Sequence, residues 1–359
     1  MKRLVVTQLV LLSLLYGSVA SASISEVKSI AYENKISMPE AKKKELHNLT
    51  ERLFNDTKNP LFNSYWRKYG DFLPLGVEVQ GSLAYGMALA DSSDLDIAFV
   101  YSYNHGSSMG NLNPVELKQK AVEAFKYIYG NLYNYEIKLP VVNLKNDEQD
   151  IDVAFFNVLS KDDRNCLVVN RCSELNYGKD TATAGWYLSE RLNLYKKLDE
   201  VFTKNTTKRA SINRAGKFFK IWRTKSFVSD EVKIPSIALV TIMYDFDAGR
   251  HYIYKNTIET LRDITNYSIE TYFKGRGCSA AADAVINLPV YQKDRNLLGR
   301  MTGPQKIKTC QKLVDFNDAL QKASSENVSE QESINILKPY IGDINSAYHP
   351  GLYVIEDGA

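Results

Sequence analysis

Residues 76–101 read GVEVQGSLAYGMALADSSDLDIAFVY and place two carboxylates, Asp94 and Asp96, inside an apolar run. Side chains in a strand alternate between its two faces, so these acids lie side by side while Leu95 and its alternate neighbours take the other face. Two adjacent carboxylates repel each other and raise each other's pKa unless a cation lies between them. The stretch therefore predicts a strand with a cation site on one face.

A second acidic pair, Asp150 and Asp152, recurs in the apolar run DIDVAFF. Mg²⁺ is a hard cation that proteins usually bind through one or two carboxylates together with substrate phosphates. Two such ions, held by acids of neighbouring strands, clamp the attacking and leaving oxygens of an in-line phosphoryl displacement. The pattern predicts a site for two Mg²⁺ ions, with Mn²⁺ as an alternative. Its metal ligands and catalytic residues are Asp94, Asp96 and one acid of the second pair.

A turn of small residues, Gly81-Ser82, lies upstream of the first acidic pair. Glycine lets a backbone approach a phosphate closely, and Ser82 offers a hydroxyl and a backbone N–H. Gly86 is expected to open a short helix whose N-terminus faces the anion. For Asp94 and Asp96 alone, a solvated edge strand is the alternative interpretation. The combination favours a nucleotide-binding site with Gly81 and Ser82 at the phosphates.

The order of these residues resembles the DNA polymerase β-like nucleotidyltransferase superfamily, whose pattern is a Gly-Ser turn, an acid-x-acid motif and a third acid on a later strand. GSLAYGMALADSSDLD is most similar to the 2′-5′-oligoadenylate synthases and to relatives that make cyclic oligonucleotides. DIDVAFFNV resembles their third-acid strand, which implies that Asp152 rather than Asp150 binds metal. The family often has threonine after Gly86, where this chain has Met87. The resemblance covers about residues 70–325.

Two helical segments also resemble the family. KFFKIWRTKSF is similar to its K-x-W helix, which implies that Lys220 contacts nucleotide phosphates, with Lys217 one turn earlier on the same face. A solvated basic helix face is the alternative. IPSIALVTIMYDF resembles a helix of the poly(A) polymerase/oligoadenylate synthase substrate-binding domain, where Ser236 and Tyr244 could approach the nucleotide. Cap or core roles are the alternative for these two residues.

The resemblance and the hydrophobic periodicity together predict an α+β fold, with a mixed-sheet nucleotidyltransferase core followed by a helical substrate-binding domain. A helix is expected to start at Pro114, because proline is favoured at the first helical position. After about residue 185 the pattern is mostly helical, beginning with GWYLSERLNLYKKLDEVF. We expect a nucleotidyltransferase domain over residues 23–205, with its catalytic core at about 72–160, and the helical domain over 206–359.

The N-terminus is typical of an export signal. Lys2 and Arg3 precede an apolar run, and small residues allow cleavage after Ala20 or Ala22, so residues 1–22 are predicted to be a signal peptide. An apolar first helix of the mature fold is the alternative. No later stretch has the length and apolarity of a membrane helix, so stable membrane insertion is not expected. The mature chain is predicted to be secreted or periplasmic, with delivery into another cell as a further hypothesis.

The chain has four cysteines, an even number that suits disulfides in an exported protein. Cys166 with Cys172 closes a short loop and is the preferred pair, and Cys278 with Cys310 would follow. A zinc site is the weaker interpretation, because no C-x-x-C motif occurs.

The overall charge does not explain nucleotide binding. The formal net charge is +3, and loss of Lys2 and Arg3 leaves 3 − 2 = +1, so a local patch must hold the phosphates. The 23 tyrosines are interpreted first as composition and core filling, with base stacking as the alternative.

Together these patterns predict an exported, Mg²⁺-dependent nucleotidyltransferase. It would transfer a nucleoside monophosphate from an NTP, with ATP as the expected donor, to a nucleotide or RNA hydroxyl and release pyrophosphate. Two alternatives remain: transfer of a single nucleotide to a small molecule or protein, and a catalytically silent binding module. Base preference, acceptor, linkage and oligomeric state are left open.

Overall fold

The computed structural model describes most of the chain between residues 24 and 345. The described ranges are 24–57, 73–91, 94–102, 113–158, 173–180, 182–202, 207–228, 232–249, 255–292 and 295–345. The predicted signal peptide and the predicted Cys166–Cys172 pair lie outside these residues.

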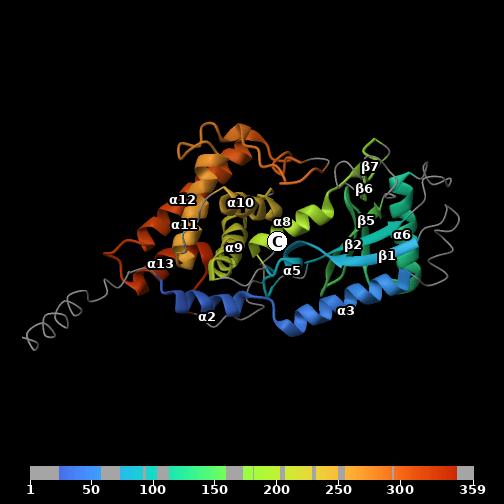
Figure 1. The fold of residues 1–359 in the computed structure, drawn as a ribbon, viewed down its shortest axis with the longest axis horizontal. Coiled ribbons are helices and arrows are strands. Elements are labelled where there is room, and N and C mark those ends of the chain that lie inside the picture. The colour runs from blue at the N-terminus through green and yellow to red at the C-terminus, as the bar shows by residue number, and fades with distance from the viewer. Residues whose placement is uncertain are drawn as a thin grey trace, which may run out of the picture.

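In the described part of the chain, seven strands form one mixed sheet (Figure 1). The main path runs β1 (Leu73–Val79), β2 (Asp94–Ser102), β5 (Asp150–Val158), β4 (Val141–Lys145) and β3 (Asn134–Ile137). The strand β6 (Ser173–Tyr177) pairs with β5, and β7 (Gly185–Leu188) pairs with β6. Among these pairs β2 and β5 run parallel, and the others are antiparallel. The predicted α+β class with a mixed sheet is confirmed.

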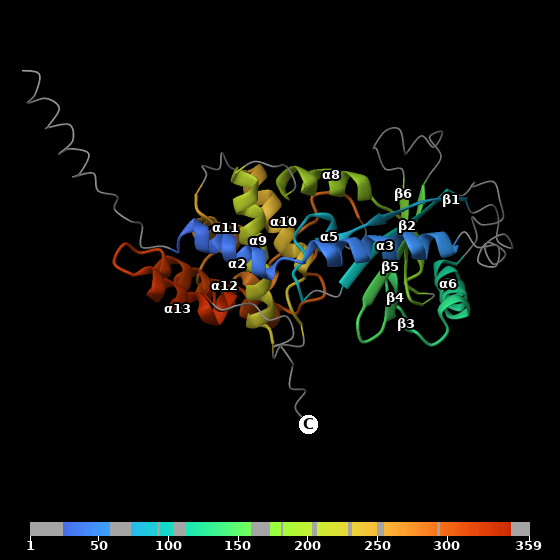
Figure 2. The same cartoon turned by 90° about the horizontal axis from the view of Figure 1, so that it is seen from below.

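One face of the sheet is covered by two helices, α3 (Glu40–Thr57) and α6 (Pro114–Tyr129) (Figures 1 and 2). The apolar residues that alternate with the acids on β2 and β5, such as Ile97 and Val153, are fully buried there. The helix α6 starts at Pro114 as predicted, and the side chain of Asn113 caps it by accepting a 2.8 Å hydrogen bond from the backbone N–H of Val115. This packing leaves the acids on the other face.

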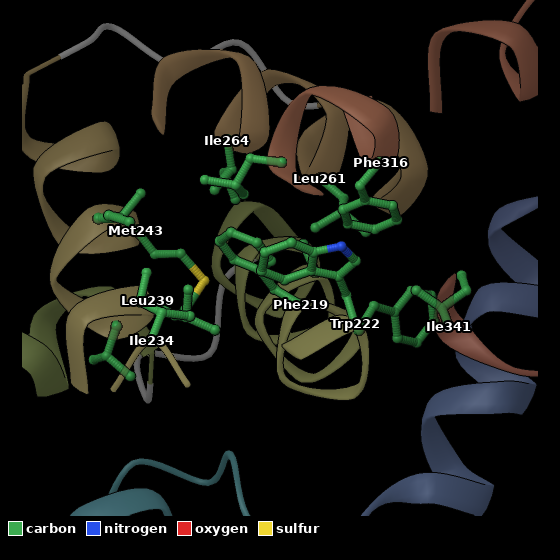
Figure 3. Close-up of a cluster of buried hydrophobic side chains, with 14 of the residues drawn as sticks. Phe219, Trp222, Ile234, Leu239, Met243, Leu261, Ile264, Phe316 and Ile341 are labelled. Atoms are coloured by element: carbon green, nitrogen blue, oxygen red, sulfur yellow. The ribbon is translucent and has the colours of Figure 1, made fainter. Parts of the chain in front are cut away.

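The C-terminal half is a bundle of helices that α8 (Arg191–Phe202) joins to the sheet (Figure 1). Its main helices are α9 (Thr207–Ser226), α10 (Ser236–Ala248), α11 (Thr257–Thr271), α12 (Gly303–Ala323) and α13 (Glu330–Ile341), with a short 3₁₀ turn, η2 (Ala281–Asp283). Trp222 of α9 is fully buried at the centre and stacks on Phe316 of α12 at 5.5 Å between ring centroids (Figure 3). The tryptophan of the K-x-W motif is therefore a core residue.

The first described helix, α2 (Glu26–Ile36), packs on the helical half although it lies in the predicted N-terminal domain (Figure 2). Glu33 forms ion pairs of 2.7 Å with both Arg214 and Lys217 of α9. Tyr32 donates a hydrogen bond of 2.5 Å to the carbonyl of Ile341 at the end of α13. In space, the helical half therefore includes residues from both ends of the described chain.

Two local predictions are wrong. GWYL was expected to begin a helix, but residues 185–188 form β7, which extends the sheet beyond β6. Gly86 was expected to open a short helix, but the helix α5 (Gly81–Ala84) comes before it. Gly86 instead has a φ of +67° in the turn that follows α5, a conformation that glycine adopts readily.

A disulfide joins Cys278 to Cys310, as predicted for this pair. It connects the loop after α11 to α12 across 32 residues, and both cysteines are buried. Among the described residues, no helix combines the length and apolarity needed to cross a bilayer.

Candidate active site

The parallel pairing of β2 with β5 gathers the acids on one face of the sheet. Asp94 pairs with Asp150 and Asp96 with Asp152, and residues that are directly opposite each other in neighbouring strands project from the same face. Two acidic motifs 56 positions apart in sequence thus become a two-by-two array of carboxylates.

The Gly-Ser turn lies directly against this array. Gly81 has a φ of +62°, and a Cβ atom added there would overlap Oδ2 of Asp96. The backbone N–H of Gln80 donates a 2.7 Å hydrogen bond to the carbonyl of Asp96, which fixes the turn to β2. The carbonyl of Ser82 accepts a 2.8 Å bond from the N–H of Met87, which closes the turn after α5. The structure therefore brings Gly81, Ser82 and Asp96 together, as the sequence predicts.

The pKa values of the first acidic pair, Asp94 and Asp96, are both raised. Burial, followed by the charges of Asp150 and Asp152, raises the pKa of Asp94 above its ordinary value. Burial, with Asp152 and Asp94, raises the pKa of Asp96 to about 6. Within the described residues, neither carboxylate has a hydrogen bond or an ion pair. Such a pair gains from any cation that binds between its members.

The second pair is held by polar neighbours on the adjacent strand. Asn143 of β4 donates from Nδ2 to Oδ1 of Asp150 at 2.6 Å and to Oδ1 of Asp152 at 2.8 Å. Lys138 lies 3.3 Å from Asp152, and Lys145 lies 3.2 Å from Asp150. Burial favours a raised pKa for Asp150, but the hydrogen bonds from Asn143 and Lys145 outweigh it and lower the pKa. The two pairs thus differ in their partners. Among the described residues Asp94 and Asp96 have no hydrogen bond or ion pair, whereas Asp150 and Asp152 have both.

Lys220 projects from α9 toward the first pair. Its ammonium donates a 3.0 Å hydrogen bond to the carbonyl of Met87, in the turn after α5. Burial lowers the pKa of Lys220 to about 8, while the charges of Asp94 and Asp96 act in the opposite direction. The helical half therefore supplies a cation that faces the carboxylates.

The other nucleotide-binding candidates lie differently. Lys217, one turn before Lys220 on α9, is engaged by α2 and the residue after it, because its ammonium is 2.7 Å from Glu33 and 2.8 Å from Oγ of Ser37. It is 6% exposed and saturated by these partners, so the structure does not bring it to the acids. Ser236 is the first residue of α10 and is half-buried. Arg223 of α9 donates to the carbonyl of Ile234, which ties the start of α10 to the same side of α9 as Lys220.

The sequence did not indicate several residues that lie at or next to the acids, among them Tyr85, Lys138, Asn143 and Arg223. Asn143 carries a signal in the sequence, because a polar residue in a buried, otherwise apolar strand requires a hydrogen-bonding partner. Tyr85 follows Gly81 by four residues, and burial with the charge of Asp96 raises its pKa to about 12. The other two become neighbours of the acids only through long-range packing.

The side chains at the acidic face fit a divalent metal in type. All donors are carboxylate oxygens, which Mg²⁺ prefers, and those of Asp94 and Asp96 are available. As the side chains stand, the described residues contain no three acidic, histidine or cysteine groups arranged to hold one ion. Asp152 is turned toward Asn143 and Lys138.

The chain matches no protein-family model and no curated protein in sequence. Solved structures do match. The CD-NTase CdnG of Bradyrhizobium diazoefficiens in complex with GTP has a TM-score of 0.65 at 13% identity, covering 89% of this chain and 94% of that one. The DncV cyclic AMP-GMP synthase of Vibrio cholerae with nonhydrolyzable GTP has a TM-score of 0.65 at 15% identity, covering 89% and 94%. CdnC of E. coli MS115-1 with ATP has a TM-score of 0.61 at 15% identity, covering 90% and 99%.

These likenesses extend over nearly the whole of each chain, so they include both the sheet and the helical half. The chain therefore shares the fold of the CD-NTases, as its resemblance to nucleotidyltransferases that make oligonucleotides implied.

Proposed function

We propose that the protein is a Mg²⁺-dependent nucleotidyltransferase, with Mn²⁺ as a substitute, that joins an NTP to the hydroxyl of a second nucleotide and releases pyrophosphate. The observation that carries this proposal is the parallel register of β2 and β5, which puts Asp94, Asp96 and Asp152 on one face. The contact of Gly81 with Asp96 supports it, because the turn lets a phosphate approach the same carboxylate.

The residues divide into those that hold metal and those that hold phosphate. Asp94, Asp96 and Asp152 would be the ligands, and divalent ions bound there would activate the acceptor hydroxyl and neutralise the phosphates. The backbone of Gly81 and the hydroxyl of Ser82 face the triphosphate, and the ammonium of Lys220 adds positive charge. In the reaction the acceptor hydroxyl would lose its proton to solvent and its oxygen would bond to the α-phosphorus, while the bond from that phosphorus to the bridging oxygen breaks and pyrophosphate leaves with the electron pair.

The names of the fold neighbours support a nucleotide as the acceptor. They are described as a cyclic AMP-GMP synthase and as CD-NTases solved with ATP or GTP. That likeness supports a nucleotide acceptor, with ATP or GTP as donor, and a linear or cyclic oligonucleotide as product. An RNA hydroxyl is a second acceptor of the same chemistry.

Mass spectrometry of the products tests this function. The purified chain from Ser23 onward would be incubated with mixed NTPs and Mg²⁺ or Mn²⁺, with and without RNA. We expect compounds in which nucleotides are joined by phosphodiester bonds, absent with an Asp94→Asn/Asp96→Asn variant. A single nucleotide attached only to a small-molecule or protein acceptor, or no product from the wild-type chain, would overturn the proposal.

We also propose that the protein is secreted or periplasmic and loses its first 20 or 22 residues. The disulfide between Cys278 and Cys310 supports this, since structural disulfides persist mainly in oxidising compartments. Ile24 is buried and the N–H of Ser25 donates a 2.9 Å bond to Glu330, so cleavage after Ala20 or Ala22 leaves these contacts intact. Because NTPs are scarce outside the cytosol, delivery into another cell would give the enzyme its substrate.

N-terminal sequencing of the protein from the native host tests the export proposal. A chain that begins at Ser21 or Ser23 in the extracellular or periplasmic fraction is expected. A full-length chain found only in the cytosol would contradict it.

A further inference from the structure

Asn143 is a buried asparagine of β4 whose side chain links the two acids of β5. It is 3% exposed and lies opposite Asp152 in the pairing of β4 with β5, so it projects from the acidic face. Its Nδ2 donates to Oδ1 of Asp152 at 2.8 Å and reaches diagonally to Oδ1 of Asp150 at 2.6 Å. A contact with the carbonyl of Ile151 is longer, at 3.5 Å. Because an amide nitrogen carries two hydrogens, Asn143 can give one to each carboxylate.

The two carboxylates differ in how many of their oxygens are engaged. Asp150 uses both, because Oδ1 accepts from Asn143 and Oδ2 lies 3.2 Å from the ammonium of Lys145. Asp152 uses one, because Asn143 and Lys138 both donate to Oδ1, the latter at 3.3 Å. Within the described part of the chain, no hydrogen bond reaches Oδ2 of Asp152. Asp152 therefore keeps an oxygen for a cation, whereas both oxygens of Asp150 are taken by its neighbours.

The second donor to Asp152, Lys138, is fixed at its backbone. Its N–H donates to the carbonyl of Val141 at 2.9 Å, and its carbonyl accepts a 3.1 Å hydrogen bond from the ammonium of Lys118. Lys118 of α6 is fully buried, so this anchor is shielded from water. Both donors to Oδ1 of Asp152 thus start from fixed positions, one in a strand and the other in the connection from β3 to β4.

We propose that Asn143 and Asp150 are positioning residues for Asp152. Asp150 holds the amide of Asn143, and Asn143 in turn holds Oδ1 of Asp152, which leaves Oδ2 for a divalent cation. A carboxylate that is already oriented loses less side-chain freedom when it binds metal, so the arrangement raises metal affinity. This inference rests on the proposed function, in which Asp152 is a metal ligand. It gives a role to Asp150, the acid of the array that the proposed function does not use.

Metal affinity without nucleotide tests these roles, and calorimetry with Mn²⁺ measures it. We expect Asn143→Leu and Asp150→Ala to weaken Mn²⁺ binding by about 10- to 100-fold, the usual effect of removing a group that orients a metal ligand. Asp150→Asn should stay within about fivefold of the wild type, because its amide oxygen still accepts from Asn143 and only one partly exposed charge is lost. Asp152→Asn changes the ligand itself and should lose more affinity than any of these.

The control is Asn176→Leu, which replaces a fully buried asparagine of β6 whose amide donates to the carbonyl of Pro114 at 3.1 Å. It should unfold at lower urea concentration than the wild type but bind Mn²⁺ equally well.

Wild-type affinity in Asn143→Leu would overturn the positioning roles. Equal losses in Asp150→Asn and Asp152→Asn would overturn them too, because Asp150 would then act as a ligand. A loss in Asn176→Leu as large as in Asn143→Leu would trace the effect to general destabilisation and have the same consequence. If the wild-type chain binds no Mn²⁺, or Asp152→Asn binds it as the wild type does, the proposed function itself fails.

Discussion

At the scale of single residues, the site depends on one contact that only glycine allows. Gly81 combines a φ of +62° with a position where any Cβ would overlap the carboxylate of Asp96. Backbone freedom and space are therefore both required at this position. Gly86 needs only the first, because its φ is +67° but a Cβ there would meet nothing nearer than Nδ2 of Asn213 at 3.8 Å.

These two glycines make a matched pair for mutation. Gly81→Ala and Gly86→Ala should each lose about 1–2 kcal/mol of unfolding free energy from the positive φ. Only Gly81→Ala should also displace Asp96 and weaken Mg²⁺ binding. Denaturant unfolding and metal titration would check this, and equal metal affinity in the two variants would contradict the assigned contact.

The raised pKa of Asp96 gives the metal-free protein a pH dependence. The pKa is about 6 in the fold against an ordinary 3.8, so ionising this carboxyl costs more in the folded state. That cost is absent below pH 4 and is fully present above pH 6, so it reduces stability as the pH rises through this window. Because metal needs the ionised form, Mg²⁺ affinity should fall as the pH drops below 6.

Asp96→Asn removes this cost. In EDTA at pH 8 the variant should be more stable than the wild type by on the order of 1–3 kcal/mol, and the difference should shrink at pH 5. Urea unfolding at both pH values measures it. A difference that does not change with pH would contradict the electrostatic account of the array.

At the scale of elements, α9 separates two lysines that look alike in sequence. Lys220 faces the acids and bonds the α5 turn, whereas Lys217, three residues earlier, is an ion-pair partner of Glu33 in α2. The K-x-W resemblance singled out Lys220, and that it contacts nucleotide phosphates stays a prediction. It could not show that Lys217 is occupied, because Glu33 lies 184 positions away.

The two lysines should therefore respond differently to substitution. Lys220→Met should weaken NTP binding by about tenfold or more with little loss of stability, because burial already disfavours its charge. Lys217→Met should leave NTP affinity unchanged and cost about 1–3 kcal/mol of unfolding free energy, since Glu33 loses a buried partner. Calorimetry with an NTP analogue measures the effect on binding, and urea unfolding measures the effect on stability. The reverse pattern would contradict the roles assigned to the two lysines.

How far the elements follow from sequence depends on how local their signals are. The alternation in β2 and β5 and the start of α6 at Pro114 depend on a few neighbouring residues, and both were predicted. The strand β7 was not, because its four residues, Gly185–Leu188, run straight into α8 and offer too few alternations to mark a strand. The site residues show the same difference. The acids and the Gly-Ser turn belong to short sequence motifs, whereas Asn143 and Lys138 reach Asp152 only through sheet pairing.

At the scale of the whole molecule, the turn after α5 joins the two halves. Met87, where related enzymes often have threonine, is fully buried in the helical core, and a Cβ at Gly216 of α9 would lie 2.6 Å from its Cε. The packing of Met87 thus fixes the turn after α5 to α9. The carbonyl of Met87 in this turn accepts a hydrogen bond from Lys220. The position of the helical half therefore determines where the ammonium of Lys220 lies relative to the acids.

The disulfide stabilises that helical half. Cys278→Ala/Cys310→Ala should lower the unfolding free energy by about 3–4 kcal/mol, the chain-entropy value for a loop of this length. Urea unfolding of the variant and of the wild type in dithiothreitol should give the same midpoint. A variant as stable as the oxidised wild type would contradict a structural role for the bond. The disulfide would then no longer support a secreted or periplasmic location.

Pyrophosphate release from NTPs tests the central claim most directly, namely that Asp94, Asp96 and Asp152 bind divalent metal for nucleotidyl transfer. Wild type, Asp94→Asn/Asp96→Asn and Asp152→Asn would be compared with Mg²⁺ and with EDTA. We predict release that requires Mg²⁺ and falls by more than about 100-fold in both variants, as expected when several kcal/mol of charge stabilisation is lost. Release at the wild-type rate from either variant, or release by the wild type in EDTA, would contradict the claim.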